Sequence, residues 1–180
     1  GDVLEPNLVY RVEADPLKAR KIIAIDGGLS QHAYHGLDMI LTRAVAVIFE
    51  YEGGSLKQVG YYPHAIVSPK LVIVADPYSD EEFAVSTSLE RQRTEIDLAA
   101  ASAKEFSPDL LLLDGSVGPH GNDKPSRSSN AYERYTSVLE SFRTLYGMPC
   151  LLAGCVEDSR GRRFCDITAK EILGEIDNPR

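Results

Sequence analysis

The sequence contains no tryptophan, only two methionines and three cysteines, and no long hydrophobic run. A membrane-spanning helix needs roughly 18 or more consecutive apolar residues, and no stretch approaches that length, so the sequence predicts no membrane span. The three cysteines, Cys150, Cys155 and Cys165, show no metal-site spacing, and an odd number cannot close a disulfide framework. We therefore expect buried thiols and a reducing, cytoplasmic location.

Positive charge is also scarce, because 19 Lys and Arg residues stand against 27 Asp and Glu, for a net charge of -8. This balance argues against a generally basic nucleic-acid-binding protein. It leaves room for an enzyme that reaches nucleic acid through a local basic strip and bound metal ions, since carboxylates that bind metal add to the negative count until the metal is present. The length predicts one domain, with residues 1–20 as a lead-in segment and residues 21–180 as the domain.

Two segments of the chain share an unusual pattern, in which an apolar run ends in aspartate and glycine. The first runs from Ile22 to Asp26-Gly27-Gly28, and the second from Leu110 to Asp114-Gly115. Short apolar runs closed by a turn signal are typical of buried strands. We therefore predict strands over residues 22–26 and 110–114, each with its aspartate at the carboxyl end, where open α/β sheets place their ligands.

The order of the remaining elements predicts an α/β fold. After the first strand and a turn at residues 27–30, we expect strands at residues 39–49, 59–67 and 71–75, with a hairpin turn at Gly53-Gly54. Helices are predicted over residues 86–106, 131–146 and 167–175, a further strand over 149–156, and a short helix near residues 16–21. An antiparallel meander followed by β-α-β-α units is the order of a ribonuclease-H-like mixed sheet with helices packed on it, in which Asp26 and Asp114 are neighbours.

Three carboxylates form the candidate site in this fold. Glu95 lies beside Ile96 at the inner edge of the long helix, and Arg91 is placed one turn earlier to pair with it. With Asp26 and Asp114, Glu95 can complete a cage for two divalent ions, which activate a water and stabilise the leaving oxygen in phosphodiester hydrolysis. A single Asp-Gly after a strand is more often a turn or a helix cap, so the site hypothesis depends on all three residues together.

The same segments resemble the NurA nuclease family. The matching motifs are residues 22–28, the Arg91-x-x-x-Glu95 helix, residues 111–116 and residues 152–160. The resemblance covers about residues 20–175. It implies a ribonuclease-H-like fold and a manganese-dependent (or magnesium-dependent) deoxyribonuclease, exonuclease or endonuclease, that acts on single-stranded DNA and DNA ends in end resection and repair. It also implies that Asp26, Glu95 and Asp114 are catalytic metal ligands, and that a homodimer pairs with a HerA-type hexameric ATPase.

Two residues depart from the family pattern, and one portion is expected to be missing. Gly28 stands where the family more often has serine, and Glu157 stands where a lysine is expected. Family members are longer, so the resemblance implies that a C-terminal portion with further site residues lies outside these 180 residues. Arg160, Arg162 and Arg163 form a basic cluster that is either a DNA-backbone contact or a solvated turn.

Two alternative functions remain open at this stage. An actin- or sugar-kinase-like nucleotide-binding module also uses Asp-x-Gly turns after strands, but such proteins are about twice as long and give Glu95 no role. A catalytically weak or inactive NurA-like domain that only docks a translocase would keep the fold without binding metal or DNA.

Overall fold

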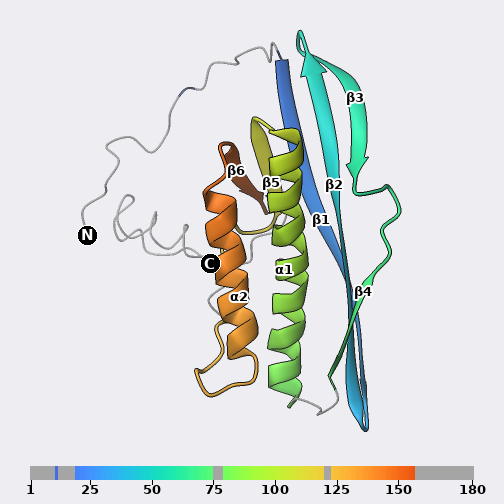
Figure 1. Ribbon diagram of the computed structural model, residues 1–180, viewed down its shortest axis with the longest axis vertical. Helices are drawn as coiled ribbons and strands as arrows, with labels where there is room; N and C mark the ends of the chain where they lie inside the picture. The colour runs from blue at the N-terminus through green and yellow to red at the C-terminus, as the bar shows by residue number, and fades with distance from the viewer. Residues whose placement is uncertain (1–10, 12–18, 75–78, 120–122, 157–180) are drawn as a thin grey trace, which may run out of the picture.

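The computed structural model describes residues 11, 19–74, 79–119 and 123–156. Its elements form a single mixed sheet with two helices on one face (Figure 1). In chain order they are β1 (Ala19–Tyr34), β2 (Leu37–Glu52), β3 (Ser55–Tyr62), β4 (Lys70–Val74), α1 (Asp80–Phe106), β5 (Leu110–Asp114), α2 (Tyr132–Tyr146) and β6 (Leu151–Cys155). None of the described helices is long and apolar enough to cross a membrane.

The strand order confirms the predicted ribonuclease-H-like arrangement. Neighbouring strands follow the order β3-β2-β1-β5-β6, and β4 pairs separately with β2. The first strands pair antiparallel, whereas β1, β5 and β6 run parallel to one another. Connections through α1 and α2 supply the crossovers that parallel pairing requires. The sheet therefore places β1 at its centre, between the antiparallel and the parallel halves.

The length of β1 corrects the predicted strand end at Asp26. The strand continues without a break through Gly27-Gly28 to Tyr34, and the turn lies at His35-Gly36. The predicted turn at residues 27–30 is wrong, because those residues belong to β1. The predicted short helix near residues 16–21 is wrong for residues 19–21, which also belong to β1, and its first part lies outside the described residues. β2 is equally long and pairs with β1 along its whole length, so ladder hydrogen bonds outweigh the local preference of two glycines for a turn.

β2 has a different antiparallel partner at each end. β3 pairs with its second half and β4 with its first half. The predicted hairpin at Gly53-Gly54 is confirmed, with φ of +59° and +82°, the values that a type I′ turn needs. The predicted strand at residues 59–67 is wrong beyond Tyr62, since β3 starts earlier and ends before Pro63, which has no N–H to continue a ladder.

The helix α1 starts six residues before its predicted beginning. Ser79 caps it, because its side-chain oxygen accepts a hydrogen bond from the Glu82 N–H (3.3 Å), and three acidic residues follow in the first turn. The helix ends as predicted, with Ser107 in the left-handed region. α2 begins one residue later than predicted.

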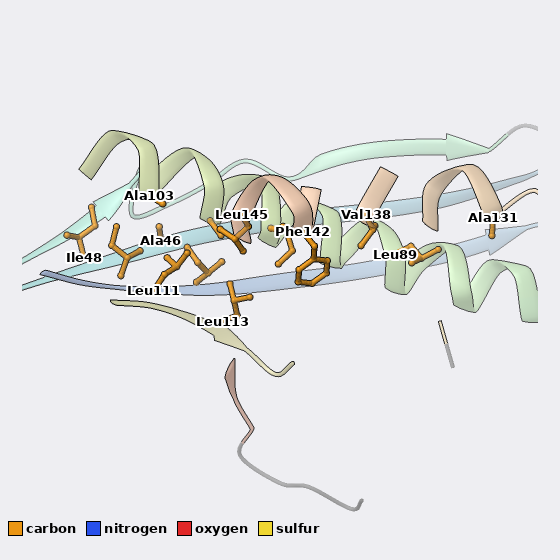
Figure 2. Close-up of a cluster of buried hydrophobic side chains, with 14 residues drawn as sticks. Ala46, Ile48, Leu89, Ala103, Leu111, Leu113, Ala131, Val138, Phe142 and Leu145 are labelled. Carbon is orange, nitrogen blue, oxygen red and sulfur yellow. The ribbon is translucent and has the colours of Figure 1, made fainter. Parts of the chain in front are cut away.

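The hydrophobic core lies between the helices and one face of the sheet. In the sheet, alternate residues of β1, β2 and β5 point into it, among them Ile23, Ile25, Leu111 and Leu113. From α1, Leu89, Ile96, Ala99 and Ala103 are all buried in this core. Figure 2 shows side chains of both helices meeting those of the sheet in this cluster.

The prediction of buried thiols is wrong for the described cysteines. Cys155 is exposed, and Cys150 is only partly buried, although burial raises the pKa of its thiol. Both lie at the edge strand β6, which no further described strand covers. Several predictions lie outside the described residues: Cys165, Glu157, the basic cluster Arg160, Arg162 and Arg163, and the final helix at residues 167–175.

Candidate active site

Asp26 and Asp114 lie side by side on adjacent parallel strands. The paired positions of β1 and β5 run as far as Ile25 and Leu113, and each aspartate is the next residue along its strand. Because Ile25 points into the core and the Cβ position of Gly27 faces Glu95, Asp26 between them projects from the opposite face of the sheet, and Asp114 is the last residue of β5. Both are exposed. β5 ends at Asp114, whereas β1 continues far beyond that point (Figure 1).

Glu95 reaches this place from α1, on the other side of the sheet. Its side chain is 6% exposed and lies against Gly27 of β1. A Cβ atom at Gly27 would be 2.0 Å from Glu95 Oε1, so only glycine leaves room for the carboxylate. Gly27, which the sequence predicted to lie in a turn, therefore leaves the space through which the Glu95 side chain extends toward Asp26 and Asp114.

The environment of Glu95 disfavours its charged form. The pKa of Glu95 is raised from 4.5 to about 7: burial raises it most, the charge of Arg91 acts to lower it, and the charges of Asp114 and Asp26 contribute to the rise. The predicted pair with Arg91 is confirmed, with Nε 3.4 Å from Oε1. Oε1 is nevertheless buried without a hydrogen-bond partner among the described residues. A buried carboxylate oxygen that accepts no hydrogen bond and lies near two further carboxylates suits a cation ligand.

Two cavities flank the carboxylates. One of about 210 Å³ is lined by Glu95, Asp114, Arg91 and Gln92, with the turn after β5. Another of about 290 Å³ is lined by Asp26 and Arg43, with residues 65–67. Among the described residues, no group of three or more His, Cys, Asp or Glu side chains is already arranged around a common metal position. The structure thus brings the three predicted residues into one neighbourhood, and their role as metal ligands stays a prediction.

The described parts of the segment between β5 and α2 are fastened to α1. Asp123 Oδ2 accepts a hydrogen bond from Gln92 Nε2 (2.6 Å), and Ser129 Oγ donates one to Glu82 Oε1 (2.8 Å). Gln92 lies one turn before Ile96 on the same helix as Glu95. Asp123 and Gln92 both line the 210 Å³ cavity, so α1 supplies both a candidate ligand and the anchor of this wall.

Sequence reasoning did not identify Arg43 as a site residue. It lies opposite Gly28 in the β1–β2 pairing, on the same face as Asp26. The available signal was a single cation inside the otherwise apolar run of residues 39–49. Its closeness to Asp26 depends on strand register, which the local pattern does not give.

Comparisons with known proteins support one family. The model of the NurA domain matches residues 20–168. Among solved structures, the NurA nuclease from Sulfolobus solfataricus is 20% identical, with a TM-score of 0.48, over 80% of this chain and 49% of that chain. A NurA bound to dAMP and manganese is 15% identical, with a TM-score of 0.36, over 59% and 22%. RNase H1 from Halobacterium salinarum NRC-1 is 12% identical, with a TM-score of 0.32, over 77% and 86%.

The comparisons differ in how much of each protein they cover. A search of curated proteins found no match. The chain spans about half the length of the Sulfolobus protein and 22% of the manganese-bound NurA. The family model, in contrast, covers most of the chain and includes all three carboxylates. The chain therefore belongs to the NurA family.

Proposed function

We propose that this chain is a metal-dependent nuclease domain that hydrolyses phosphodiester bonds in single-stranded DNA and at DNA ends. The observation that carries the proposal is the neighbourhood of three carboxylates: Asp26 and Asp114 follow paired positions of β1 and β5, and the Glu95 carboxylate lies against Gly27 with a buried oxygen that accepts no hydrogen bond from a described group. Family membership supports the same function.

Each carboxylate has a distinct task in this proposal. Asp26 and Asp114 are exposed on adjacent strands, and Glu95 offers a buried oxygen from the helix side. Mn²⁺ or Mg²⁺ takes such oxygen ligands, and when bound it activates water and stabilises the leaving oxygen. Arg91 holds the Glu95 carboxylate by its charge, and Gly27 leaves the space in which that carboxylate lies.

The finer parts of the function rest on the family alone. We propose that manganese is the working metal, that the chain acts in DNA-end processing, and that it works in the cytoplasm as a homodimer with a HerA-type hexameric ATPase. NurA has been crystallised with manganese, which supports this choice of metal. Arg160, Arg162 and Arg163 remain proposed DNA contacts.

Substitution of either aspartate tests the proposal. Asp26→Asn and Asp114→Asn keep the side-chain shape but remove an anionic ligand. Because metal-ion catalysis supplies several kcal/mol of charge stabilisation, each change should lower Mn²⁺-dependent cleavage of a labelled single strand by on the order of a thousandfold. Circular dichroism should show an unchanged fold.

Asp97→Asn is the matched control. Asp97 is exposed on the same helix as Glu95 and contacts Arg93 and Ser141, away from both cavities. This variant should cleave like the unmodified chain. Full activity in both Asp26→Asn and Asp114→Asn would refute the nuclease assignment. An unmodified chain that folds but binds neither Mn²⁺ nor DNA would support a docking domain instead.

A further inference from the structure

Arg43 occupies an unusual position on the sheet face that carries Asp26. It is exposed in the middle of β2, directly across from Gly28, and it lines the 290 Å³ cavity together with Asp26. Its side chain lies over Gly28, because a Cβ atom there would be 2.9 Å from Arg43 Nε and 3.2 Å from Cγ. The guanidinium group is thus held along the strand that carries a candidate metal ligand.

The charge of Arg43 is not neutralised by the described part of the chain. Arg91 and Arg93 on α1 pair with Glu95 and Asp97, whereas no described carboxylate forms an ion pair with Arg43. A planar guanidinium with free donors fits the oxygens of a phosphate group, which it can bind through two parallel hydrogen bonds. In an acidic protein, such a cation beside a cluster of carboxylates is well suited to attract a phosphodiester.

Part of the cavity lining is apolar. Ala65, Ile66 and Val67, in the segment between β3 and β4, contribute to it, and Ile66 is 90% exposed. A cavity lined by both a cation and apolar side chains matches a nucleotide unit, which has an anionic phosphate and an apolar base face. A purely structural arginine would not need this open apolar neighbour.

We propose that Arg43 binds a backbone phosphate of the nucleic-acid strand and thereby positions the neighbouring phosphodiester at Asp26. The inference rests on the proposed nuclease function and adds a substrate-positioning residue to it. The inference also explains why glycine is present at position 28, because the Cβ atom of a serine there would crowd the guanidinium group of Arg43. In this chain, the glycine leaves the space that the arginine side chain occupies.

Binding in the absence of hydrolysis tests Arg43 separately from catalysis. A fluorescein-labelled oligothymidylate is titrated with the chain in Ca²⁺ and without Mn²⁺, and anisotropy is followed from low to moderate salt. Arg43→Ala should weaken binding about tenfold, the effect of losing one charge-assisted hydrogen-bonding contact. The slope of log affinity against log salt should fall by about 0.7, the value for one phosphate of a single strand. Arg43→Lys should restore the slope but only part of the affinity, because lysine keeps the charge and loses the fork.

Arg143→Ala is the matched control, because Arg143 is an exposed arginine in the last turn of α2 and lines neither cavity. It should leave affinity and slope unchanged. Binding by the unmodified chain together with unchanged affinity and slope in Arg43→Ala would overturn the inference while leaving the nuclease proposal intact. An unmodified chain that binds no single-stranded DNA would overturn it as well, whereas loss of cleavage alone in the aspartate variants does not bear on it.

Gly28→Ser gives a second, independent measurement. The added Cβ should displace the flexible end of Arg43 and weaken binding in the same direction as Arg43→Ala. In an Arg43→Ala background, the same serine should cost nothing further, because the group it displaces is gone. Additive losses in the double variant would show that Gly28 acts without Arg43 and would contradict the proposed arrangement.

Discussion

Asp26-Gly27 within β1 and Asp114-Gly115 at the end of β5 are the same dipeptide after the same kind of apolar run, and the two aspartates follow paired positions of the sheet. Gly27 has ordinary extended backbone within a continuous strand, and its missing side chain makes space for Glu95. Gly115 has φ of +89° and open space around its Cβ position. The first glycine is required by packing and the second by backbone conformation.

The two glycines therefore serve different purposes. A side chain at Gly27 would displace the Glu95 carboxylate from the candidate site. A side chain at Gly115 would instead strain the turn that follows Asp114. The Gly115 N–H donates to the Cys155 carbonyl (2.7 Å), which ties this turn to β6. Substitution of each glycine separates the two roles.

Of the two glycine substitutions, Gly27→Ala should have the larger effect, and that effect should be on activity. The new methyl group overlaps Glu95 Oε1, Cγ and Cδ, so the carboxylate must leave its place. We expect Mn²⁺-dependent cleavage to fall by on the order of a hundredfold or more, comparable to the loss of an oriented metal-site group. Gly36→Ala is the control, because no atom lies within 4 Å of its Cβ position. A fully active Gly27→Ala variant would show that Glu95 does not work from this position.

Glu95→Gln should reduce the pH dependence of the free energy of unfolding in the metal-free chain. Because the folded state raises the Glu95 pKa from 4.5 to about 7, the folded chain holds this proton more tightly than the unfolded chain. Its contribution is present below pH 4.5 and is lost as pH rises through about 7. At about 1.36 kcal/mol per pKa unit, the loss is about 3 kcal/mol.

Urea unfolding in EDTA at pH 4.5 and pH 8 measures this contribution. Glu95→Gln should be more stable than the unmodified chain at pH 8 and similar to it at pH 4.5. Asp97→Asn should reproduce the unmodified pH dependence. Parallel pH curves for the unmodified chain and Glu95→Gln would contradict the raised pKa. Added Mn²⁺ should stabilise the unmodified chain more at pH 8 than at pH 6, since the metal competes with the proton on Glu95.

Gly115→Ala should have the smallest effect, and that effect should be on stability. A non-glycine residue at positive φ costs about 1–3 kcal/mol, and no neighbouring atom resists the added methyl group. Thermal unfolding should therefore occur at lower temperature, while the folded fraction keeps most of its cleavage activity. Gly115→Asn should lose less stability, because asparagine tolerates the left-handed region better. Equal losses in the two variants would point to a steric cause.

Several elements with a local signal were predicted well from the sequence. The strand at residues 110–114 was predicted residue for residue, and the end of the long helix at Phe106 was correct. Apolar runs and capping residues act over a few positions, so they can be found without knowing the fold. The start of α1 was missed although Ser79 and Glu82 form a recognisable cap.

Errors arose where a distant partner decided the outcome. Gly27-Gly28 is a local turn signal, and only the paired length of β2 keeps the strand extended there. The closeness of Asp26 and Asp114 could be predicted because topology alone sets it. The position of Arg43 near Asp26 could not be predicted, because it depends on the β1–β2 register, which pairs Gly28 with Arg43.

The fastening of the β5–α2 segment to α1 through Asp123 and Ser129 has a mechanical consequence. Glu95 and the described wall of its cavity share one rigid support, whereas Asp26 belongs to the long β1–β2 hairpin. A displacement of α1 along its axis would carry Glu95 and this wall together and leave Asp26 behind. The distance between the Glu95 and Asp26 carboxylates therefore depends on the position of α1 relative to the β1–β2 hairpin.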